Sequence, residues 1–114
     1  MIREIPEEVA TELLMKTYDA AAFVLNDLDK LQALIQSVSD FPFSLVQQFI
    51  QKIQTYPDNH FSFESIQLMV AALLYLQSGK DLIPDSDAEL GYVDDYAVLL
   101  ACKKLVIENE GELS

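Results

Sequence analysis

The residues best suited to chemistry lie in an acidic segment between Ser78 and Asp95, which holds six carboxylates and one base. Divalent cations such as calcium and magnesium prefer oxygen ligands, so one interpretation is a cation site. Its candidate ligands are Asp81, Asp85, Asp94 and Asp95. The spacing does not fit an EF-hand. Counted from Asp85, the sixth position is Leu90 and the twelfth is Tyr96, where an EF-hand needs glycine and glutamate.

An architectural interpretation of the same aspartates is favoured over the cation site. Asp85 and Asp94 are residue types that accept hydrogen bonds from free backbone amides at helix starts, and Asp95 would favour the positive end of a helix. Capping aspartates are common, and each stabilises a helix by about 1 kcal/mol. We therefore assign no metal ligand and no cofactor.

Catalysis by paired carboxylates is a more distant alternative. A carboxylate-based hydrolase needs a cleft, and a loop on the surface of a compact bundle offers none. His60 is the only histidine and Cys102 the only cysteine, and they are far apart in the sequence, so no Ser-His-Asp or Cys-His set is expected. We expect no enzymatic activity. A single cysteine within an apolar run is typical of a buried thiol in a reducing compartment, which favours a cytoplasmic location.

The elements that must position this segment are predicted to be helices. Apolar residues recur at steps of three and four throughout the chain, and only three glycines occur. We expect one helix over about 6–37, with a break near Thr17-Tyr18-Asp19 left open, and a one-sided helix from about Leu45 to a stop before Pro57. The fold class is therefore all-α, a compact bundle of four or five helices.

A central buried hairpin is predicted from the two most apolar segments, about 63–78 and 94–109. Gly79 is expected to end the first of these helices, and Asp94 to open the second. The residues expected to be most buried are Leu73, Leu74, Val98 and Leu99. The chain is interpreted as a single domain over 1–114, in which amphipathic helices of 1–60 wrap the hairpin of 61–109 and 110–114 form a tail.

The hairpin resembles the YkvA-like family of unknown function over about residues 68–103. The resemblance rests on Tyr75, Ser78, Asp81-Leu82-Ile83-Pro84-Asp85, Leu90-Gly91-Tyr92, Asp94-Asp95 and Ala97-Val98-Leu99. It implies that Asp81, Pro84, Asp85, Gly91, Asp94 and Asp95 form a structural motif, and it implies no activity. Two polar departures, Gly79-Lys80 and Ser86-Asp87-Ala88-Glu89, argue against the membrane association seen in many relatives.

The charge balance limits the partners. The chain has 19 acids and 7 bases, a net charge of −12 and a pI of about 4.1. Binding to nucleic acid or to anionic membranes needs clustered bases, so neither is expected. The N-terminus has no apolar stretch typical of a signal peptide.

The sequence favours a non-catalytic structural or protein-interaction module, with a protein partner or self-association. The candidate interface anchors are Phe41, Phe43, Phe61 and Phe63. The alternative is that these aromatic side chains pack helix starts onto the core. A domain that binds a divalent cation remains the second interpretation, and a hydrolase the third.

Overall fold

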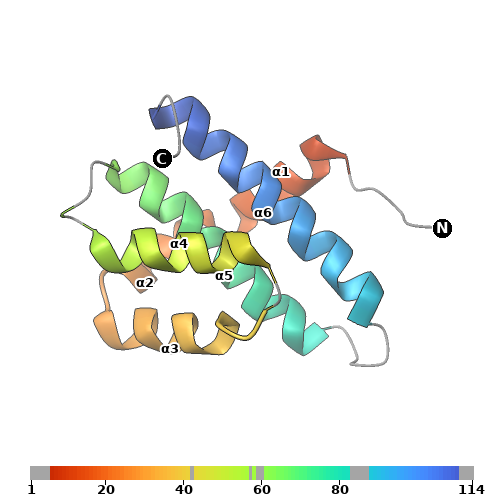
Figure 1. Cartoon of the computed structure of the whole chain (residues 1–114), viewed down its shortest axis with the longest axis horizontal. Helices are drawn as coiled ribbons and strands as arrows, with labels where there is room; N and C mark the ends of the chain where they lie inside the picture. Colours follow the sequence, from red (N-terminus) through yellow and green to blue (C-terminus); the bar gives the residue numbers. More distant parts are fainter. Residues whose placement is uncertain (1–5, 42, 57, 59–60, 83–87, 111–114) are drawn as a thin grey trace.

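All secondary structure in the described part of the chain is helical. The computed structural model describes residues 6–41, 43–56, 58, 61–82 and 88–110, and of residues 79–82 and 88–95 it describes the backbone alone. These ranges contain six helices and no strand, which confirms the predicted all-α class with one helix more than expected (Figure 1). The helices are α1 (Glu7–Lys16), α2 (Tyr18–Leu25), α3 (Leu28–Val38), α4 (Ser44–Thr55), α5 (Phe63–Leu82) and α6 (Ala88–Glu110).

The helix expected over 6–37 is divided into α1, α2 and α3. The first break lies at Thr17, in the stretch where the sequence analysis allows for a break. The hydroxyl of Thr17 donates to the carbonyl oxygen of Leu14 at 3.0 Å and to that of Ala71 in α5 at 2.7 Å. The second break was not expected. It is set by Asp27, whose carboxylate accepts hydrogen bonds from the backbone amides of Asp29 and Lys30 and so caps α3.

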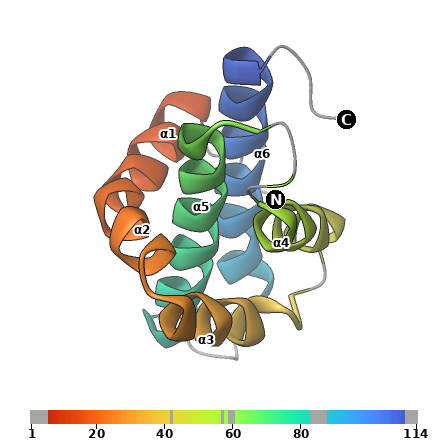
Figure 2. The ribbon, with the colours of Figure 1, turned by 90° about the vertical axis from the view of Figure 1, so that its left-hand side faces the viewer.

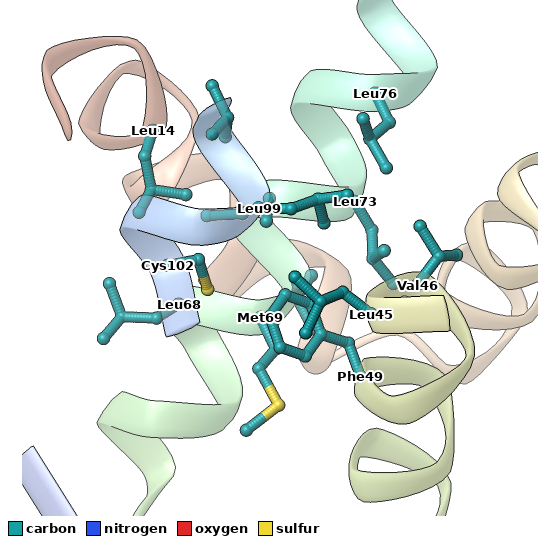
Figure 3. Packing of buried hydrophobic residues seen from close by; sticks show 14 of the residues in the cluster. Leu14, Leu45, Val46, Phe49, Leu68, Met69, Leu73, Leu76, Leu99 and Cys102 are labelled. Carbon is teal, nitrogen blue, oxygen red and sulfur yellow. The ribbon is translucent and has the colours of Figure 1, made fainter. Parts of the chain in front are cut away.

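Helix α5 lies at the centre of the molecule and contacts all five other helices (Figure 2). Its sequence is apolar on nearly every side, so the side chains that are buried point in several directions rather than along one stripe. Leu73 and Leu76 of α5 pack near Leu99 of α6, and Met69 of α5 packs near Phe49 of α4 (Figure 3). The predicted central position of this helix is confirmed.

Both helices of the predicted hairpin extend further than expected toward the segment that joins them. Helix α5 continues past Gly79 to Leu82, so the prediction that Gly79 ends it is wrong. A glycine inside a helix costs only about 1 kcal/mol, which the extensive packing of α5 can offset. Helix α6 begins at Ala88, six residues before Asp94, so the expected start at Asp94 is also wrong. Ala88 and Glu89 favour helix, and the chain becomes helical before Gly91.

Helix α6 packs on α5 and α1 and leaves one side uncovered. Val98 and Leu99 are fully buried, as is Leu73, and all three match the predicted core. Leu74 is only partly buried, so it is not among the most buried residues. Leu100 is exposed, which shows that α6 is less completely surrounded than α5.

A polar cluster ties the start of α5 to the end of α6. One carboxylate oxygen of Glu110 accepts hydrogen bonds from the backbone amide of Ser62 at 2.7 Å and from the hydroxyl of Ser65 at 2.8 Å. The amide of Asn109 donates to the hydroxyl oxygens of Ser62 and Ser65 at 2.9 and 2.8 Å. The hydroxyl of Ser62 also accepts a hydrogen bond from the backbone amide of Ser65 and so caps the start of α5. The buried Ser65 hydroxyl is thereby satisfied.

Candidate interaction surface

The acidic segment falls at the facing ends of two consecutive helices. Asp81 lies in the last turn of α5, and Gly91, Asp94 and Asp95 lie within α6. Pro84 and Asp85 lie outside the described residues. Asp94 and Asp95 are the seventh and eighth residues of α6, beyond the first turn, where free amides and the helix dipole act. Capping at a helix start therefore does not explain these two aspartates.

No metal cluster is present among the residues whose side chains are described. No group of three or more His, Cys, Asp or Glu side chains there is placed to hold an ion. The four candidate ligands from Asp81 to Asp95 lie outside this set, so a cation site in the acidic segment stays a prediction. His60 also lies outside the described residues.

Cys102 is buried in the core between α6 and α5 (Figure 3). Burial removes the thiol from water and raises its pKa far above the ordinary value. A reactive cysteine needs the opposite conditions, namely an exposed thiol with a lowered pKa. The prediction of a buried thiol is confirmed.

The four phenylalanines around α4 have different environments. Phe41 and Phe61 are buried, so these two pack onto the core rather than serve as interface anchors. The Phe43 ring is partly buried against Tyr96 of α6, with ring centroids 5.3 Å apart. Phe63 is more exposed and lies near Tyr56, with ring centroids 6.3 Å apart.

The most exposed large apolar side chains of the described chain lie where α2 meets α3. Phe23 is 73% exposed and Leu28 is 66% exposed, whereas the next most exposed, Tyr96, is 46% exposed. The chain turns tightly between Phe23 and Leu28. The backbone amide of Asn26 donates to the carbonyl oxygen of Ala22, and that of Asp27 donates to the carbonyl oxygen of Val24. Phe23 and Leu28 therefore lie on the two sides of one tight turn, five residues apart in the sequence.

We define the α2–α3 corner as Asp19, Phe23, Leu28 and Asp29. Asp19 and Phe23 are four residues apart in α2 and so share a face of that helix. Helices α2 and α3 pack on α5, on the side away from α6 (Figure 2). The sequence contained a signal for this surface. Phe23 is an aromatic residue outside the repeat of Tyr18, Ala21 and Leu25.

The charges at the corner are acidic. The segment from Lys16 to Lys30 contains three acids, Asp19, Asp27 and Asp29, and two bases, which are the exposed lysines at its two ends. Asp19 and Asp29 are exposed. Burial, and then the charges of Glu64 in α5 and of Asp19, raise the pKa of Tyr18 at the start of α2. An apolar centre at this corner thus has an acidic rim.

The corner is joined to the core by hydrogen bonds as well as by apolar packing. The side-chain amide of Gln67 in α5 donates to the carbonyl oxygen of Tyr18 at 2.8 Å, next to the bond from Thr17 to Ala71. The carboxylate of Asp27 holds the start of α3. These bonds hold the start of α2 against α5 and cap the start of α3.

The described part of the chain is helical throughout its secondary structure, and one segment of the chain matches a family without an assigned activity. Residues 66–101 match the family model described as protein of unknown function (DUF1232). The match confirms the expected resemblance and covers most of α5 and the first part of α6. No curated protein and no solved structure matches the chain. The α2–α3 corner lies outside the matched segment.

None of the described helices combines the length and the apolar character needed to cross a bilayer.

Proposed function

We propose that this protein is a non-catalytic protein-interaction module that binds its partner through the α2–α3 corner. The observation that carries the proposal is the joint exposure of Phe23 and Leu28, 73% and 66%, on one corner. Burial of such a side chain yields about 1.5–3 kcal/mol, so covering both provides a substantial driving force for association. Aromatic side chains are enriched among residues that dominate binding energy.

The titratable groups of the described chain support the non-catalytic part of the proposal. Catalytic groups usually combine a shifted pKa with access to a cleft. The shift of Cys102 comes from burial alone. The pKa of Lys104 is raised mainly by its hydrogen bond to the carboxylate of Glu7, and both side chains are exposed on the surface. Neither pattern is typical of an acid, a base or a nucleophile at work.

Site-specific photo-crosslinking tests this function. A photoreactive phenylalanine analogue replaces Phe23, and the full chain is irradiated in an extract of its native host. We expect a discrete adduct that disappears when Leu28→Ser is added. The matched control carries the same analogue at Leu100, which is exposed on α6. An adduct pattern that is the same from both positions, or that ignores Leu28→Ser, would contradict the proposal.

A further inference from the structure

We infer that the occupant of the α2–α3 corner is a basic amphipathic segment of a partner protein, in which apolar side chains are flanked by Lys or Arg. This inference rests on the proposed function and adds the chemistry of the partner. It follows from two properties of the same corner, its apolar centre and its acidic rim.

The small size of the apolar centre favours a partner that is a short amphipathic element rather than a large flat surface. Phe23 and Leu28 project from adjacent helices on either side of the Asn26–Asp27 turn. A helix that presents apolar residues every three or four positions can place two of them against such a pair. Ala20, which is also exposed, adds a small side chain to the same face of α2 as Phe23.

The acidic rim selects the charge of the partner. Asp19 lies one helical turn before Phe23, and Asp29 directly follows Leu28. Both carboxylates are exposed, and Asp29 is followed directly by the exposed Lys30. A partner with Lys or Arg next to its apolar anchors would bring opposite charges together, which increases the association rate and excludes acidic competitors. The net charge of −12 attracts a basic segment from a distance as well.

The same charges argue against two other occupants. A second copy of this chain would bring a second acidic rim and a second net charge of −12 to the contact, and like charges at an interface are unfavourable. An anionic lipid surface would be repelled for the same reason, because binding to it relies on clustered Lys and Arg.

The corner is prepared for binding because its backbone is already held. Gln67 and Thr17 fasten the start of α2 to α5, and Asp27 caps α3. A surface that is ordered before binding loses less conformational freedom when a partner docks. We therefore expect a short peptide to bind without a large rearrangement of the protein.

A pair of synthetic helical peptides tests the partner chemistry. Both are amphipathic and carry leucine on one face, and they differ only in Lys or Glu at the flanking positions. Binding to the full chain is measured by fluorescence anisotropy at low and at physiological salt. We expect the Lys peptide to bind more tightly than the Glu peptide, and the difference to shrink as salt is added.

Variants of the protein test the apolar and the acidic side chains of the corner separately. Phe23→Ser/Leu28→Ser should abolish binding of the Lys peptide, whereas Leu100→Ser should leave it intact. Asp19→Asn/Asp29→Asn should weaken it by about three- to tenfold, as expected for two exposed charge pairs. The charge control is Glu8→Gln/Glu108→Gln, which removes two exposed acids from α1 and α6 and should have a smaller effect.

The outcomes separate this inference from the proposed function. Equal binding of both peptides, or of neither peptide while the Phe23 crosslink persists, overturns the basic partner and leaves the interaction function standing. Loss of the crosslink together with peptide binding that is unchanged in Phe23→Ser/Leu28→Ser overturns both. Dimerisation in sedimentation velocity, or binding to phosphatidylserine vesicles, that depends on Phe23 and Leu28 replaces the basic segment with a second copy or a membrane.

Discussion

Leu73 is a residue on which the packing of several helices depends. It is fully buried in α5, which contacts every other helix, so its truncation leaves a cavity that no single neighbour can fill. We expect Leu73→Ala to lower the free energy of unfolding by about 2–5 kcal/mol. Urea denaturation measures this loss. Leu74→Ala, at the partly buried neighbouring position, is the matched control and should cost less. Equal costs would show that α5 is not central.

Cys102 gives a prediction about pH. Burial raises its pKa from an ordinary 9.0, so the folded protein keeps the thiol neutral while the unfolded chain releases its proton. Stability from this group is therefore present below about pH 9 and is lost as the pH rises above that value. The loss between pH 8 and 10 should be larger in the wild type than in Cys102→Ala, as measured by urea denaturation at each pH. A disulfide-exchange reagent should react with Cys102 only after unfolding.

Two outcomes of these experiments would contradict the burial of the Cys102 thiol. Fast labelling of the native protein, with a rate close to that of the unfolded chain, would show that Cys102 is accessible. An identical pH dependence in the wild type and in Cys102→Ala would contradict the burial described above.

At the scale of elements, Glu110 acts at the end of α6 on the beginning of α5. Its carboxylate accepts two hydrogen bonds at the start of α5, one of them from the buried Ser65. We expect Glu110→Ala to lower stability by about 1–2 kcal/mol, as for the loss of a helix cap. The control is Glu108→Ala, an exposed acid near the same helix end. Thermal melts of both variants give the comparison, and equal shifts would remove the special role of Glu110.

The elements were predicted where periodicity and caps agree. The one-sided helix α4 was expected from its apolar spacing, and the five buried residues that it contributes carry that spacing: Leu45, Val46, Phe49, Ile50 and Ile53. The division at Asp27 was not expected, because the apolar steps of three and four continue across it. Here the local hydrogen bonds of an aspartate cap end the periodic pattern.

The inner ends of the hairpin were misplaced for a related reason. Gly79 is typical of a helix end and Asp94 of a helix start, but both are residue types that a helix can also contain. Ala88 and Glu89, which precede Gly91, are good helix formers. Local signals set helix ends weakly when long apolar segments on both sides favour continued helix.

The candidate surface could be predicted only in part. The acidic character and the expectation of a protein partner follow from composition, whereas two of the four phenylalanines around α4, Phe41 and Phe61, are buried and so do not serve as exposed anchors. Leu28 continues an apolar repeat that normally faces a core, and only the turn at Asp27 places it outside. Exposure at that position depends on how α3 crosses α5, which no local pattern specifies.

For the whole molecule, the predicted cation site is tested by thermal melting with added calcium or magnesium and with chelator. Under the proposed interaction function we expect no shift, because a bound ion is not part of it. A cation that binds the folded state would raise the melting temperature in proportion to its saturation. A shift of several degrees that is lost in Asp85→Asn would establish the cation site instead, while the same shift in Asp85→Asn would assign it to other acids.

The central position of α5 has a consequence for whether the matched segment can fold alone. Residues 66–101 make up a helix that is apolar on almost every side and part of its neighbour, so alone they would leave most of their buried surface in water. Chains below about 40 residues rarely fold without an added staple. We therefore expect residues 66–101 to fold only together with helices that cover α5. A covering helix needs only an apolar stripe toward α5, which leaves its outward face available for contacts with a partner.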